Sequence, residues 1–82
     1  MTDQALREKL CSELARLLKA ERERQNISLN SLAEKAGLNR QTVSFVESEE
    51  RTPTIDTLLR LTNVLGVPLE DLIRKARKAV TK

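Results

Sequence analysis

Residues 28–47 read SLNSLAEKAGLNRQTVSFVE, and they decide the fold because they predict two short helices separated by one glycine. Ser28 can cap the first helix, since its hydroxyl can accept a backbone N–H that has no partner at the helix start. Gly37 stands where a helix end favours the left-handed conformation, and Asn39 can cap the second helix, which spans 40–47. Helices joined by so short a turn cannot lie antiparallel, so we expect them to cross at a steep angle.

The two sides of the second predicted helix differ in chemistry. Four side chains fall within roughly 140° of one another on one side: Arg40, Gln41, Ser44 and Phe45. The other side carries Val43, Val46 and Glu47. Arg, Gln and Ser can hydrogen-bond base edges and phosphates, while valines can anchor a helix to a core. The pattern therefore favours a helix-turn-helix that presents its second helix to nucleic acid, against the alternative of a solvated surface helix.

The composition predicts a single all-α domain over 1–82. The chain has no Trp, no Tyr and one Phe, and its aliphatic residues do not alternate with polar ones as they do in strands. A chain of this length can bury roughly 60–65% of its unfolded surface, which is enough for one aliphatic core. We expect a compact five-helix fold.

Catalytic and metal-binding chemistry lacks its usual residues. Histidine is absent and Cys11 stands alone, so neither a zinc cluster nor a Ser/His/Asp or Cys/His nucleophile can be assembled. We therefore predict a protein that is not an enzyme and holds no cofactor or metal. Cys11 is expected to pack as a small buried hydrophobe, and a single cysteine suits a reducing cytoplasm. No apolar run approaches the roughly 20 residues that span a bilayer, and the N-terminus does not resemble a signal peptide, so we expect no membrane contact.

Three further helices are expected around this unit. The first reaches about Gln25 from a cap at Thr2 or Asp3 and buries a stripe of leucines. Another spans 55–65 and buries some combination of Ile55, Leu58, Leu59, Leu61, Val64 and Leu65. The last helix opens at Pro68, because proline suits the first turn of a helix.

The C-terminal segment 74–82 carries five cations and no acid. Since the whole chain has a net charge of +3, the rest of it carries −2. A basic tail on a near-neutral body can be an electrostatic footprint for nucleic acid. It can equally be a solvated helix end whose cations complement the helix dipole.

The segment from Arg22 through Ile73 resembles the phage repressor/Cro-type helix-turn-helix family, also called the XRE family of bacterial and phage regulators. The residues that carry the resemblance are Ile27-Ser28, Leu32-Ala33-Glu34-Lys35-Ala36-Gly37-Leu38, Thr42-Val43-Ser44, Val46-Glu47, Pro53, Leu58-Leu59, and Leu65-Gly66-Val67 with Leu72. The resemblance implies a compact five-helix domain that binds operator DNA, commonly as a dimer. It thus implies a small transcriptional regulator of a bacterium, phage or plasmid, which binds double-stranded DNA sequence-specifically.

The resemblance also implies roles for individual residues. The recognition-helix positions that face base edges are Arg40, Gln41, Ser44 and Phe45. The positions that approach phosphates, at helix starts and in a loop, are Ser28, Leu29, Asn39, Ser48, Arg51 and Thr52. Arg22 and Glu47 match positions that pair the first helix with the third, and a charge this close to a core needs a partner, so we predict an ion pair between them.

Three features depart from the family pattern. Leu29 replaces a frequent Gln, which leaves only its backbone amide for a phosphate. Phe45 replaces a residue that is usually polar, and it either touches a thymine methyl or covers the edge of the core. Glu49 and Glu50 follow the third helix, where the family usually has glycine, and their charges should repel phosphate.

A single recognition helix reads only a few base pairs, so we expect a homodimer on an inverted-repeat operator. The predicted interface lies on the last helix and comprises Leu69, Leu72, Ile73 and Ala76. The alternative interface is the first helix, through Leu6 and Leu10. No domain for a small-molecule effector is evident. The alternative function is a protein-interaction module, such as the antitoxin of a toxin–antitoxin pair, whose main partner is a protein.

Overall fold

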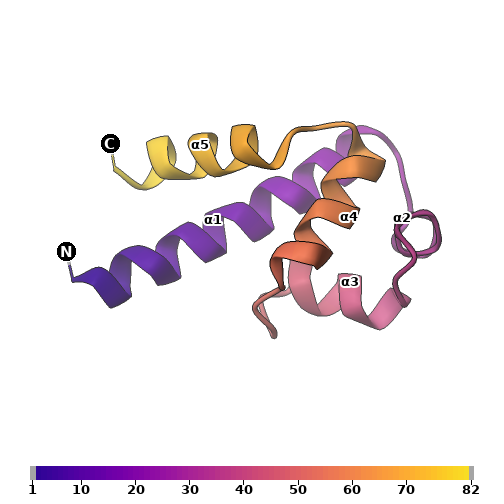
Figure 1. Cartoon of the computed structure of the whole chain (residues 1–82), viewed down its shortest axis with the longest axis horizontal. Helices are drawn as coiled ribbons and strands as arrows, with labels where there is room; N and C mark the ends of the chain where they lie inside the picture. The colour runs from indigo at the N-terminus through magenta and orange to yellow at the C-terminus, as the bar shows by residue number, and fades with distance from the viewer. Residues whose placement is uncertain (1, 82) are drawn as a thin grey trace.

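A computed structural model describes residues 2–81 of the chain. This part forms five helices and no strand: α1 (Asp3–Arg24), α2 (Leu29–Ala36), α3 (Arg40–Glu47), α4 (Ile55–Leu65) and α5 (Leu69–Val80). The helices α3 and α4 pack against α1, and α2 packs against α3 and α4. The helix α5 runs back along α1 in the opposite direction (Figure 1). The predicted all-α, five-helix fold is confirmed.

The bounds of the helices follow from their capping residues. In each of four N-caps a side-chain oxygen accepts the backbone N–H three residues later, at 3.0–3.1 Å: Thr2, Ser28, Asn39 and Thr54. Gly37 ends α2 with φ 70°, and Gly66 ends α4 with φ 72°. Only glycine adopts this left-handed conformation without steric penalty, so both helices end where the sequence places a glycine.

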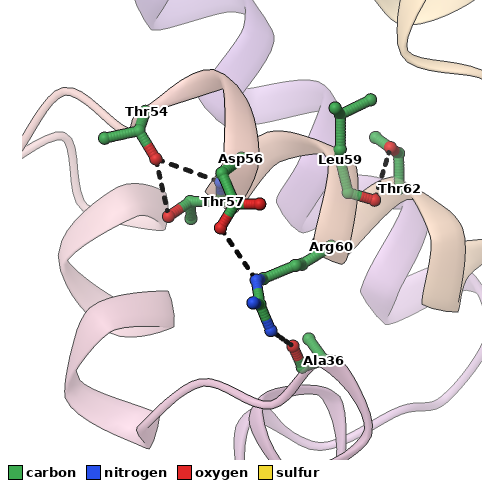
Figure 2. Close-up of polar contacts among 7 residues, drawn as sticks. All are labelled: Ala36, Thr54, Asp56, Thr57, Leu59, Arg60 and Thr62. Carbon is green, nitrogen blue, oxygen red and sulfur yellow. Dashed lines mark hydrogen bonds and ion pairs between the residues drawn. The ribbon is translucent and has the colours of Figure 1, made fainter.

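One aliphatic core holds the helices together. Its buried members are Leu18, Leu32, Ala33, Ala36, Val43, Val46, Leu58, Leu61, Leu65, Leu69 and Leu72. Thr62 is the one polar residue of 2–81 that is buried as a whole residue, and its Oγ1 donates to the Leu58 carbonyl at 2.9 Å. The same Oγ1 also donates to the Leu59 carbonyl at 3.3 Å (Figure 2). The core is therefore apolar with its one hydroxyl satisfied.

A side chain of α4 fixes the end of α2. Arg60 donates from Nη1 to the Ala36 carbonyl at 3.2 Å and from Nε to Asp56 Oδ2 at 2.9 Å (Figure 2). The last carbonyls of a helix have no partner within the helix, so this contact satisfies one of them. A Cβ added at Gly37 would lie 3.0 Å from Arg60 Nη1, so the turn after α2 is restricted by space as well as by backbone conformation.

Three details of the expected fold are corrected or made definite. Cys11 is exposed, because α3 and α4 cover only the C-terminal half of α1 (Figure 1). Of the candidates for burial on α4, Leu58, Leu61 and Leu65 are buried, whereas Ile55 and Leu59 are exposed. Pro68 precedes α5 as its N-cap residue and makes no side-chain capping hydrogen bond.

Candidate nucleic-acid interface

The turn between α2 and α3 holds the two helices at a fixed angle. After Ala36 the chain reverses through Gly37, and the Leu38 amide donates to the Ala33 carbonyl at 2.8 Å. Asn39 is extended, with φ −86° and ψ 153°, and its side chain caps α3. The half-buried Leu38 packs against the core between the helices. The two helices thus form a helix-turn-helix, with α3 exposed on its outer side.

The inner side of α3 is anchored in the core. Val43 is 0% exposed and Val46 is 3% exposed. On the opposite side Arg40 and Gln41 are exposed, while the neighbouring Ser44 and Phe45 are half-buried. The four residues predicted to contact bases therefore lie together on the side of α3 that faces away from the core.

An ion pair joins α3 to α1. Arg22 Nε lies 2.7 Å from Glu47 Oε2, and Arg22 Nη2 lies 2.9 Å from Glu47 Oε1. The third donor, Nη1, binds the Ile27 carbonyl at 2.9 Å. The two side chains are 12% and 8% exposed, and the hydrogen bond to the Glu47 carboxylate raises the pKa of Arg22. The structure thus contains the pair that the sequence predicts, with the bidentate geometry that arginine favours.

The arginines of the described chain divide into two groups. Six are paired with acidic side chains: Arg7, Arg16, Arg22, Arg24, Arg60 and Arg74. Arg40, Arg51 and Arg77 form no ion pair with any residue of 2–81. Arg40 is the first residue of α3 and Arg51 lies in the loop after it, so two of the three arginines without an acidic partner lie near the two ends of this helix. Their charge is available to an external anion.

The residues predicted to contact phosphates differ in whether their side chains are free to do so. The side chains of Ser28 and Asn39 already accept backbone amides as caps, and Leu29 is half-buried against the core. Ser48 is exposed, although its Oγ lies 3.4 Å from the Phe45 carbonyl. Arg51 is also exposed, as is Thr52 beside it. We conclude that any phosphate contact at the helix starts must use backbone amides, whereas Arg51 can offer a side chain.

The loop after α3 has an acidic residue in a glycine-like conformation. Glu49 has φ 65°, which costs an L-residue roughly 1–2 kcal/mol. Its carboxylate accepts a hydrogen bond from Ser12 on α1. Sequence reasoning missed this contact, although the absence of the usual glycine signalled that a side chain occupied a turn position. The Ser12 contact ties the loop, and one of its two acids, to α1.

The predicted dimer surface on α5 is wrong in three of its four residues. Leu69, Leu72 and Ala76 are only 8%, 3% and 2% exposed, because they pack inside the chain, where α5 lies along α1. Ile73 is 42% exposed and remains on the surface. The helix α5, which carries most of the predicted basic tail, lies on the other side of α1 from α3 (Figure 1). Lys82 of that tail falls outside the described residues.

Two kinds of feature are absent from residues 2–81. Within 2–81 no cluster of His, Cys, Asp and Glu could hold a metal ion. In the same range no helix has the length and apolar character needed to cross a membrane.

Comparisons with known proteins identify similar chains. Residues 18–72 match the family described as helix-turn-helix. Two curated proteins, from Methanosarcina mazei and Methanosarcina acetivorans, bear the name "Putative HTH-type transcriptional regulatory protein". Each is 42% identical to this chain over 53 residues, which make up 65% of this chain and 16% of the relative. The match therefore spans a small part of these relatives.

A solved structure is similar in both fold and sequence. It is the crystal structure of SinR, the master regulator for biofilm formation, in complex with DNA. The TM-score is 0.68 and the sequence identity is 33%, over 73% of this chain and 97% of that chain.

Proposed function

Because this chain belongs to the XRE-type helix-turn-helix family, we propose that it regulates transcription by binding double-stranded DNA sequence-specifically, with α3 in the major groove. The observation that carries the proposal is the outer side of α3. Arg40 and Gln41 are exposed there, and Arg40 has no acidic partner within 2–81. Arginine can bind guanine with two hydrogen bonds and glutamine can bind adenine in the same way.

The anchoring of α3 supports this role. A major groove about 12 Å wide admits one α-helix, but base edges are read only if the helix is held at a fixed depth and angle. The buried Val43 and Val46 hold the inner side of α3. The Arg22–Glu47 pair holds its C-terminal end. The side chains of the outer side are then free to differ without disturbing the core.

The starts of α2 and α3 support phosphate contacts. The first amides of a helix have no partner within it, and they lie at the positive end of the helix dipole. The caps at Ser28 and Asn39 occupy the amides of Ser31 and Thr42, so the amides that precede these remain for an anion. Phosphates bound at the two helix starts would fix the position of α3 along the duplex.

The test is selection of bound sites from random duplex DNA by the purified protein. We expect enrichment of one sequence, and an inverted repeat if two copies bind together. The variant Arg40→Ala/Gln41→Ala should lose that enrichment, while Lys9→Ala, which removes an exposed cation from α1, should retain it. If the wild-type protein enriched no sequence, the proposed function would be wrong.

We also propose that two copies bind one operator. Two recognition helices are needed to find one site in a genome, and half-sites about 34 Å apart require two domains. Ile73, 42% exposed on α5, supports an interface there, and the half-buried Leu6 and Leu10 support the alternative on α1. Sedimentation with and without the selected site gives the stoichiometry. A protein partner of a different kind would instead co-purify with the chain.

A location in the cytoplasm agrees with this function. The exposed Cys11 has no cysteine with which to pair inside the chain, which suits a reducing compartment.

A further inference from the structure

The loop that follows α3 turns back onto the end of that helix. The amides of Glu50 and Arg51 both point to the Phe45 carbonyl, at 3.0 Å and 3.4 Å. The left-handed conformation of Glu49 makes this reversal possible. As a result, Arg51 returns to the side of α3 that carries Phe45 instead of leading away from it.

The guanidinium of Arg51 lies over the ring of Phe45. Its Cζ is 4.8 Å from the ring centroid, within the distance at which a cation and an aromatic face attract each other. Arg51 has no ion pair or hydrogen bond from its side chain within 2–81, although Glu49 and Glu50 are its neighbours in sequence. Glu49 is engaged with Ser12 instead. The ring therefore restrains the guanidinium without occupying its five N–H donors.

We propose that Phe45 is a positioning residue, which acts through Arg51 rather than by touching a base. This inference rests on the proposed DNA binding. It assigns to Arg51 a phosphate contact at the C-terminal end of α3. A guanidinium already held in place loses less conformational freedom when it binds a phosphate. The ring face attracts cations, so the phosphate is bound by the arginine and not by the ring. This role differs from both roles predicted for Phe45 from the sequence, a thymine contact and a cover for the core.

The role of Arg51 can be separated from that of Phe45 by a cycle of four proteins: wild type, Phe45→Leu, Arg51→Ala and the double variant. Binding to a duplex that carries the selected site is measured at several salt concentrations. Arg51→Ala should weaken binding to all duplexes and lower the slope of log affinity against log salt by about 0.9, the value for one phosphate contact. Phe45→Leu should weaken binding about two- to fivefold, as expected for loss of an exposed cation–π contact.

The decisive comparison is made in the Arg51→Ala background. If Phe45 acts through Arg51, Phe45→Leu should have no further effect there. Any effect of the leucine on folding is present in both backgrounds and cancels in the cycle. Phe45→Tyr keeps the aromatic face and should retain wild-type affinity, whereas Phe45→Met keeps an apolar side chain without a ring and should behave as Phe45→Leu does.

Several results would overturn the inference. If Phe45→Leu lowered the DNA affinity equally in the wild-type and Arg51→Ala proteins, Phe45 would not act through Arg51. A changed preference at one base pair would assign it a direct base contact. Wild-type affinity in Phe45→Leu would show that the ring contributes nothing to binding. These results all require wild-type protein that binds DNA, so they are distinct from failure of the proposed function, in which the wild type binds no duplex and the role of Phe45 is lost with it.

Discussion

The strongest effect on stability is expected from breaking the Arg22–Glu47 pair. In Glu47→Ala the Arg22 guanidinium, 12% exposed, keeps only the Ile27 carbonyl as an acceptor. Removing one partner of a buried pair costs about 3–5 kcal/mol. A domain of this size has a total free energy of unfolding of roughly 4–12 kcal/mol, at 0.05–0.15 kcal/mol per residue. The variant should therefore lose a large part of its stability, and its melting temperature should fall by at least about 12 °C.

The measurement is urea denaturation followed by circular dichroism near pH 7. The matched control is Arg7→Ala, which breaks an exposed pair with Asp3 on the same helix α1, with side chains 67% and 83% exposed. The free energy of unfolding of Arg7→Ala should fall by less than about 1 kcal/mol. The double variant Arg22→Met/Glu47→Leu removes both charges and should recover most of the stability, because the penalty comes from the unpaired charge. If Glu47→Ala cost no more than Arg7→Ala, the pair would not anchor α3.

The other predictions concern the recognition side, the loop and the dimer. Arg40→Ala or Gln41→Ala should cost about 1–3 kcal/mol on the selected site and relax selectivity at one base pair, as titrations with point-mutated duplexes will show; unchanged preference in both would reject the recognition-helix assignment. Glu49→Gly should raise the free energy of unfolding by about 1 kcal/mol, since φ 65° suits glycine, and should tighten binding to every duplex by removing an anion; a lower melting temperature would mean that the lost Ser12 contact matters more. Ile73→Asp should give a monomer in sedimentation while Leu6→Asp leaves a dimer, and the opposite result would place the interface on α1.

Local chemistry explains why much of the fold could be predicted. A cap such as Ser28 or Asn39 and a glycine such as Gly37 act on the few residues beside them, so they specify where α2 and α3 begin and end without reference to the rest of the chain. The need of Glu47 for an ion-pair partner could also be predicted from the sequence, because a charged residue on the inner margin of a helix requires one. The Arg22–Glu47 pair follows from that requirement together with the family resemblance.

Which surface covers an apolar stripe could not be predicted in the same way. The spacing of Leu69, Leu72 and Ala76 gives α5 one apolar side, but periodicity does not say whether the helix packs on its own chain or on a second copy. In the structure α1 covers this side, and only Ile73 stays exposed. The contact between Phe45 and Arg51 could not be predicted from the sequence either, because it depends on how the loop turns back, and hence on the conformation of Glu49.

The inner side of α3 contributes to the stability of the fold, whereas its outer side carries the residues proposed to read DNA. Val43 and Glu47 make their contacts inside the chain, so changing them changes the folded state. Arg40 and Gln41 have exposed side chains that form no hydrogen bond or ion pair within 2–81, and substitutions at such surface positions usually alter stability by about 0.5 kcal/mol or less. Under the proposed function, the same substitutions would change which hydrogen bonds the helix offers to base edges. A DNA-binding chain built in this way could acquire a new target sequence while it keeps its core, its caps and the ion pair that holds the helix in place.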